Sequence, residues 1–157
     1  NSRSDQVRRV YLSTGMSTLE EVEVAVERLD AIEELYLLHC TSQYPTEDEN
    51  VNLRAMLTLK ETFPDYPVGY SDHSRGIEAC LAAVVLGAAV LEKHFTYHLQ
   101  MPGDDHEGAM TPETLGELVR GVERVEQILG SAEKKPVGAE DKAMGALRVE
   151  MREVGFD

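Results

Sequence analysis

The chain has 157 residues, 42% of them hydrophobic and 28% charged, which is the balance of an ordinary globular domain. Fifteen Lys and Arg against 29 Asp and Glu leave a net charge of −14, which disfavours nucleic acid and anionic membranes as partners. The longest apolar run, 80–91, is shorter than the roughly 20 residues of a membrane span, and two cysteines make no disulfide framework. We therefore expect a cytoplasmic protein, and its start at Asn1 suggests a fragment of a longer chain.

Four strand candidates alternate with four helix candidates, and a charged tail follows. Short apolar runs predict the strands, and apolar residues at helical spacing after capping residues predict the helices. The strands are expected over 10–14, 35–40, 68–71 (extending toward His73) and 89–95. The helices are expected from a cap at Ser17 or Thr18 to Ala31, from a cap at Asn50 or Asn52 to Phe63, over 77–86, and from Thr111 to Leu129, with a weak helix or linker over 140–152.

This alternation predicts an α/β fold with a parallel sheet and right-handed helical crossovers. Four such units make either a small doubly wound sheet or half of an eight-unit barrel. The first strand is followed by Ser13-Thr14-Gly15-Met16-Ser17, which lacks the further glycines of a dinucleotide-binding turn, and no phosphate-cradling loop is present.

Polar residues gather where the last two strands end. His73 and His94 are one strand-helix unit apart, and neighbouring parallel strands lie about 4.8 Å apart, so both rings can reach one metal ion. Side chains alternate along a strand, so Ser71 shares a face with His73, and Glu92 with His94. Two histidines without a third ligand favour an open, partly hydrated Mn²⁺ or Mg²⁺ over zinc, and the alternative is a pair of hydrogen-bonded structural histidines.

Other reactive side chains have simpler explanations. His39 and Cys40 are adjacent on a strand and point to opposite faces, which disfavours a catalytic Cys–His pair. Cys80 lies in an apolar helix and is expected in the core. The pair Asp104-Asp105 is most simply a polar loop, although it follows the fourth strand and lies over the same end of the sheet.

Several strings then occur in a specific order: Leu12-Ser13-Thr14-Gly15-Met16, Leu38-His39-Cys40-Thr41-Ser42, Tyr44-Pro45-Thr46, Gly69-Tyr70-Ser71-Asp72-His73, Leu86-Gly87-Ala88, Glu92-Lys93-His94-Phe95-Thr96 and Pro102-Gly103-Asp104-Asp105-His106. With them the chain, from about residue 10 to residue 138, resembles the sialic acid synthase family. That family comprises the N-acetylneuraminate synthases and their legionaminic and pseudaminic acid relatives.

The resemblance implies a (β/α)₈ TIM barrel followed by a small antifreeze-like domain. This chain would supply the second half of the barrel, strands five to eight, over 10–130, after a lead-in over 1–9 and before a tail or linker over 131–157. The implied reaction condenses phosphoenolpyruvate with an N-acetylated amino sugar, typically N-acetylmannosamine, and uses Mn²⁺ or Mg²⁺. A homodimer is implied for the full-length protein.

The resemblance also assigns roles to residues at matching positions. Two residues are candidate metal ligands, two bind phosphoenolpyruvate, and the others surround the amino sugar. These are His73 and His94 for the metal, Ser42 and Ser71 for phosphoenolpyruvate, Tyr44 and Asp105 for the sugar, and Glu92 beside it, with Glu92 and Asp105 as the candidate catalytic residues. Many family members have Asn at the position of Ser42, and Ser is a shorter donor.

The family's general-base Glu and its phosphoenolpyruvate-binding lysines belong to the first half of the barrel, which this sequence does not contain. We therefore expect the isolated chain to bind metal weakly and not to catalyse. One alternative is a non-catalytic half-barrel that assembles with a second chain. Another is a small doubly wound protein of the response-regulator or phosphatase type, but the first strand ends on Ser13 and Thr14 rather than on an acidic cluster.

Overall fold

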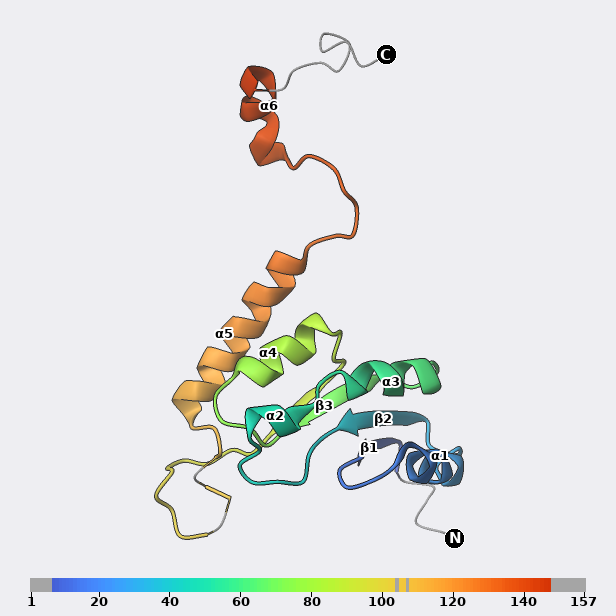
Figure 1. The fold of residues 1–157 in the computed structure, drawn as a ribbon. Helices are drawn as coiled ribbons and strands as arrows, with labels where there is room; N and C mark the ends of the chain where they lie inside the picture. Colours follow the sequence, from blue (N-terminus) through green and yellow to red (C-terminus); the bar gives the residue numbers. More distant parts are fainter. Residues whose placement is uncertain (1–6, 104, 107, 148–157) are drawn as a thin grey trace.

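A computed structural model describes residues 7–103, 105, 106 and 108–147 of the chain (Figure 1). Each of the four strands is followed by at least one helix, as the sequence predicts, and β2 is followed by two. In chain order the elements are β1 (Arg9–Ser13), α1 (Leu19–Arg28), β2 (Glu34–His39), α2 (Asp48–Val51), α3 (Ala55–Thr62), β3 (Val68–Asp72), α4 (Glu78–Val85), β4 (Leu91–Lys93), α5 (Pro112–Leu129), the 3₁₀ turn η2 (Gly138–Glu140) and α6 (Asp141–Leu147).

The four strands form one parallel sheet in the order β1-β2-β3-β4, so each strand lies beside its neighbours in the chain. Consecutive parallel strands need a long crossover, and α1, α3 and α4 each provide one. The result is a half-barrel of the α/β class, which confirms the predicted parallel fold. Because all strands run the same way, their carboxyl ends meet at one edge of the sheet.

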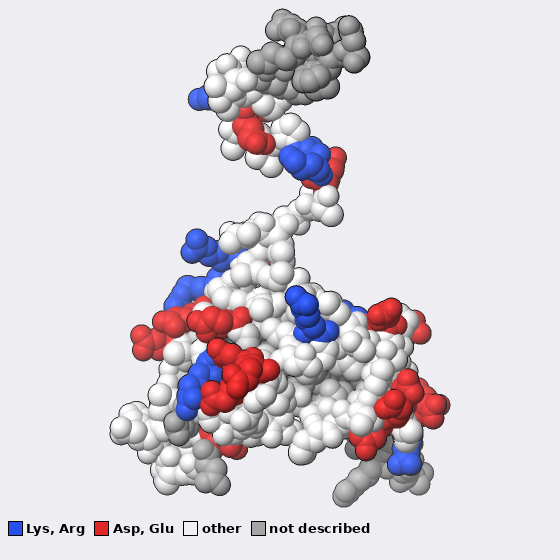
Figure 2. All heavy atoms as spheres, viewed as in Figure 1, with Lys and Arg blue, Asp and Glu red and all other residues white. Residues whose placement is uncertain are grey.

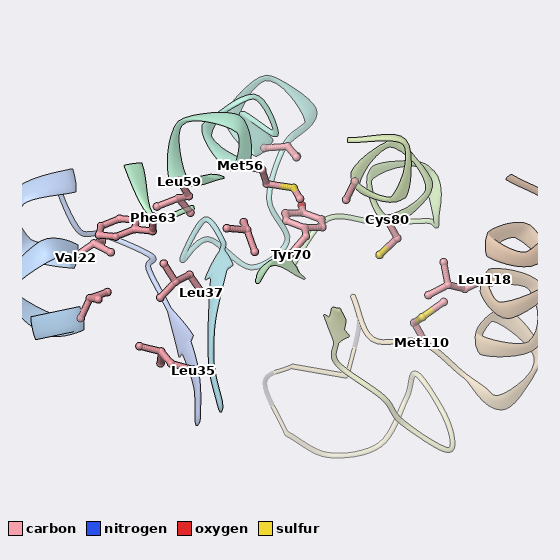
Figure 3. Close-up of a cluster of buried hydrophobic side chains, with 14 residues drawn as sticks. Val22, Leu35, Leu37, Met56, Leu59, Phe63, Tyr70, Cys80, Met110 and Leu118 are labelled. Atoms are coloured by element: carbon pink, nitrogen blue, oxygen red, sulfur yellow. The ribbon is translucent and has the colours of Figure 1, made fainter. Parts of the chain in front are cut away.

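The hydrophobic core lies between the sheet and its covering helices (Figure 3). Leu35 and Leu37 of β2 alternate with residues of the other face and are almost fully buried. The opposite face carries Tyr11 and Tyr36, whose ring centroids are 5.0 Å apart, and Tyr11 remains 45% exposed. The helices therefore cover one face of the sheet, and the face that bears Tyr11 is only partly covered by the described residues.

Two expected elements differ in extent. The helix expected from a cap at Asn50 or Asn52 to Phe63 is regular only as α3, from Ala55, and the short α2 precedes it in a segment expected mostly as a loop. Asn52 separates α2 from α3 because it adopts a left-handed conformation with φ of 46°, which Asn tolerates better than most residues. The strand expected over 89–95 is regular only over Leu91–Lys93, which pair with Tyr70–Asp72 of β3. Beyond it the chain leaves the ladder, and Phe95 forms a bridge with Met110 instead.

The last helix of the body, α5, begins as expected at Thr111. The Thr111 hydroxyl accepts the Thr114 N–H, Pro112 occupies the first turn, and the helix packs on α4 through buried Leu118. In the tail, α6 falls within the expected weak helix, and residues 148–152 of that expectation lie outside the described residues. None of the helices in the described ranges is long and apolar enough to cross a bilayer.

Charged side chains are spread over the surface in separate groups. On the face in view, Lys and Arg of the described residues form isolated positions rather than a continuous basic stripe (Figure 2). This distribution agrees with the net charge of −14.

Leu37→Ala should lower the free energy of unfolding by about 2–5 kcal/mol, because the Leu37 side chain of β2 is fully buried in the core between the sheet and the helices. Leu57→Ala provides the matched control, since Leu57 is 45% exposed and the same truncation there should cost much less. Urea unfolding followed by circular dichroism measures both values. Equal losses in the two variants would contradict the core described above.

Candidate active site

A small pocket opens at the carboxyl ends of β3 and β4, under the loops that follow β2 and β4. Both candidate metal ligands line it, together with two of the candidate sugar-binding residues. Its described lining residues are Tyr44, Pro45, Asp72, His73, His94, Asp105 and Gly108.

The ring of His73 is held in one orientation. Its Nδ1 lies 2.7 Å from the carbonyl oxygen of Thr41, and because a carbonyl only accepts, Nδ1 carries the hydrogen. In the neutral ring this leaves the Nε2 lone pair facing the pocket, where the Tyr44 hydroxyl donates to it at 2.8 Å. The Tyr44 ring stacks on His73 with centroids 4.0 Å apart. A histidine whose other nitrogen bonds a backbone carbonyl is the usual arrangement of a metal ligand.

His94 faces His73 from the next strand end. The two ring centroids are 5.5 Å apart and nearly perpendicular, and Tyr44 lies 4.9 Å from His94. On the outer side, Nδ1 of His94 is 3.9 Å from a carboxylate oxygen of Asp105, in the loop after β4. The fold therefore brings both histidines, Tyr44 and Asp105 together.

Ser71 and Glu92 lie next to the histidines, as side-chain alternation predicts. They are directly paired in the β3–β4 register, and the Ser71 hydroxyl donates to the Glu92 carboxylate at 2.7 Å. The same hydroxyl is 3.5 Å from Nε2 of His73. Ser71 is buried whereas Glu92 is exposed, so Glu92 can accept further hydrogen bonds from a ligand.

Ser42 lies farther along the edge, beside the end of β1. A Cβ added to Gly15 would come within 2.3 Å of the Ser42 hydroxyl and 2.8 Å of the Cys40 sulfur, so only glycine allows this close approach. The structure thus places the exposed Ser42 at the Gly15 turn rather than among the pocket-lining residues.

Three other side chains considered from sequence are buried, and their surroundings explain them without a role in chemistry. His39 is buried, with Nε2 2.8 Å from the Val51 carbonyl and its ring stacked on Tyr70. Burial raises the pKa of the neighbouring Cys40 thiol and favours its neutral form, which argues against a thiolate nucleophile. Cys80 is fully buried, in agreement with the predicted core position.

The side chains of this pocket suit a metal site that water or substrate completes better than one formed by protein ligands alone. Within the described ranges, no three His, Cys, Asp or Glu residues gather closely enough to hold a metal ion by themselves. Two imidazoles with a nearby carboxylate are ligand types that Mn²⁺ accepts, whereas structural zinc takes four protein ligands. The side chains present fit an ion that keeps water or substrate oxygens in its other positions.

Asp72 and Lys93 occur in the ordered sequence strings, but no role is predicted for them. Their side chains form a buried salt bridge of 2.8 Å, on the face of the strands opposite to the histidines. Burial by itself would raise the pKa of Asp72, but hydrogen bonds from Lys93 and Ser74 outweigh it and lower the pKa. The sequence feature that could have predicted this pair is the occurrence of opposite charges at core-facing positions of two adjacent strands.

Fold and site together define the class: a parallel α/β half-barrel with a polar, histidine-bearing site at the carboxyl edge of its strands. A family model described as the NeuB family matches residues 3–134, and the chain belongs to that family. This confirms the resemblance drawn from the ordered sequence strings.

Named relatives agree with this assignment. The chain is 47% identical over 133 residues to N,N'-diacetyllegionaminic acid synthase of Legionella pneumophila, an alignment that covers 81% of this chain and 37% of that protein. It is 40% identical to human N-acetylneuraminate-9-phosphate synthase, over 82% of this chain and 36% of that protein. The chain therefore spans little more than a third of the length of these relatives.

A solved structure has the same fold. The N-acetylneuraminic acid (sialic acid) synthetase of Leptospira borgpetersenii, crystallised with citrate, superposes with a TM-score of 0.79 at 38% identity. The superposition covers 94% of this chain and 53% of that one. The half-barrel thus matches part of a sialic acid synthetase.

Tyr44→Phe should change the nitrogen signal of His73 Nε2, because it removes the hydroxyl that donates to this atom, and leave the hydrogen on Nδ1. Long-range ¹H–¹⁵N NMR of the neutral imidazole rings reports both features. Tyr97→Phe is the matched control, since Tyr97 is 80% exposed and its ring contacts Phe95 instead. A His73 ring protonated on Nε2 in the unmodified chain would contradict the described orientation.

Proposed function

We propose that this chain is the metal-bearing half, strands five to eight, of a (β/α)₈ barrel enzyme. That enzyme would condense phosphoenolpyruvate with N-acetylmannosamine or a related N-acetylated amino sugar to give a nonulosonic acid and phosphate. The observation that carries the proposal is the facing pair His73 and His94, 5.5 Å apart at neighbouring strand ends, in a chain of the NeuB family.

His73 and His94 would hold the divalent ion, Mn²⁺ or Mg²⁺. The orientation of His73 by the Thr41 carbonyl supports this role, because it leaves a lone pair directed into the pocket. When bound, such an ion supplies Lewis-acid polarisation of the sugar aldehyde. Waters and substrate oxygens would complete its coordination.

The remaining side chains would hold the two substrates. Ser71 and Ser42 would donate hydrogen bonds to phosphoenolpyruvate, while Tyr44 and Asp105 would contact the amino sugar. Carbon 3 of phosphoenolpyruvate forms a bond to the aldehyde carbon, water adds at carbon 2, and the bond from carbon 2 to the phosphate oxygen breaks. Glu92 and Asp105 are the carboxylates placed to accept protons or hydrogen bonds from hydroxyl groups during these steps.

The charge of the pocket favours an unphosphorylated sugar. Its described lining carries the Asp105 carboxylate but no Lys or Arg, and a second phosphate would have no cationic partner among these residues. The enzyme's location in the cytoplasm and its assembly as a homodimer are further parts of the proposal, supported by the family assignment alone.

A non-catalytic half-barrel that assembles with a second chain is the second candidate. The support for it is that β1 and β4 form the edges of the described sheet and that Tyr11 is 45% exposed on the uncovered face. Unpaired strand edges are ready sites for association. Gel filtration tests this candidate: a monomer opposes it, whereas a dimer is compatible with both candidates.

His73→Ala and His94→Ala should each abolish Mn²⁺ binding to the chain, because each removes one of only two imidazole ligands. Isothermal titration calorimetry with MnCl₂ measures the loss against the unmodified chain. His98→Ala is the matched control, since His98 is an exposed histidine in the loop after β4 and should leave binding unchanged. Binding that survives both substitutions would place the metal elsewhere.

The isolated chain should release no phosphate from phosphoenolpyruvate and N-acetylmannosamine, because the proposed enzyme also needs residues that this sequence lacks. A coupled phosphate assay with Mn²⁺ tests this, with the full-length Legionella relative and its own substrates as the positive control. Sugar-dependent phosphate release from the 157-residue chain would overturn the proposal that this half is inactive alone.

A further inference from the structure

The buried salt bridge lies directly beneath the histidine pair. Asp72 and Lys93 are the last residues of β3 and β4, they are cross-strand partners, and each immediately precedes one of the histidines. Lys93 Nζ is 2.8 Å from Asp72 Oδ2, and the two side chains are 6% and 0% exposed. One ion pair therefore ties together the two strand ends from which His73 and His94 project.

Every polar atom of this pair has partners. Oδ1 of Asp72 accepts the Tyr70 hydroxyl at 3.0 Å, the Ser74 N–H at 2.8 Å and the Ser74 hydroxyl at 2.7 Å. Oδ2 accepts from Lys93 and, at 3.2 Å, from the Cys80 thiol. Lys93 donates a second bond to the Ser74 carbonyl. Among the described residues, no buried side-chain nitrogen or oxygen lacks a partner.

These bonds surround the backbone of His73. The bond from Ser74 N–H to the Asp72 carboxylate closes an Asx-turn whose central residue is His73. Lys93 connects both ends of that turn to β4, one residue before His94. On the other side, the carbonyl of His73 accepts the Thr46 N–H at 2.9 Å. The pair thus adds side-chain bonds between the two strand ends to the backbone bonds that hold the two histidines.

A gain in folding stability does not by itself explain why a buried ion pair occupies these two positions. Burying two charges costs desolvation energy, and replacing a buried ion pair by neutral side chains of similar volume is often neutral or stabilising. A buried pair can instead select one arrangement among several of similar energy. Here the selected arrangement is the spacing of two imidazoles on the opposite face of the same strands.

We propose that Asp72 and Lys93 are a positioning pair that sets the distance and orientation between the His73 and His94 rings. The pair acts from the helix-covered face and does not touch the pocket contents through its charged atoms. The effect of the pair on metal binding rests on the proposed function. Its effect on the geometry of the two rings can be tested without any metal.

The double variant Asp72→Asn/Lys93→Met tests the pair, because it removes both charges at nearly constant volume and leaves no lone buried charge. The matched control is Glu33→Gln/Arg8→Met, which makes the same type of change at an exposed ion pair. Urea unfolding, ¹H–¹⁵N signals of the two rings without metal, and Mn²⁺ titration are measured on each chain.

The double variant should stay folded, shift the ring signals of both His73 and His94, and lose roughly 10–100-fold in Mn²⁺ affinity. The control variant should leave both the ring signals and the Mn²⁺ affinity unchanged. A folded double variant with unchanged ring signals would overturn the positioning role. Shifted ring signals in a chain that binds no Mn²⁺ even unmodified would support the positioning role and contradict the proposed metal site.

Tyr70→Phe is a second, milder variant that tests the same proposal if the double variant does not fold. It removes one hydrogen bond to Asp72 Oδ1 and leaves both charges and the aromatic ring in place. The ring signals of both His73 and His94 should shift from their positions in the unmodified chain, by less than is expected for loss of both charges. Unchanged signals in this folded variant would overturn the inference.

Discussion

Successive side chains of a β-strand point to opposite faces, and both the core and the site depend on this constraint. At the ends of β3 and β4 it separates two kinds of polar residue. Ser71 and His73 lie on one face, where Ser71 bonds Glu92, while the side chain of Asp72 between them points to the other face and is fully buried with Lys93. The pattern repeats one strand away in Glu92, Lys93 and His94. Six consecutive-strand positions therefore supply both the site and the buried Asp72–Lys93 pair behind it.

The parallel register carries this local pattern into a site. Helical crossovers make all four strands end at one edge, and the direct pairing of Ser71 with Glu92 places the two histidines at equal height. Loops then add Tyr44 and Asp105 from either side. The half-barrel provides one side of a pocket, which agrees with a chain that spans little more than a third of its synthase relatives.

Electrostatics shape what such a pocket binds. Carboxylates near the histidines repel anions, and a divalent cation bound there would reverse the local charge and allow an anionic ligand to approach. The Asp72 carboxylate is already neutralised by Lys93 and lies on the other face. Among the described residues around the histidines, Glu92 and Asp105 are exposed carboxylates that remain available to a ligand.

The sequence by itself determined the order of elements, the cap at Thr111 and the faces of Ser71, His73, Glu92 and His94, because these follow from local periodicity and capping chemistry. Only the tertiary structure decided the rest. The break at Asn52 and the short β4 depend on how the chain packs and pairs with distant residues. The stacking of Tyr44 on His73 and the burial of Asp72 with Lys93 arise between segments far apart in the sequence, where no local pattern sets a distance.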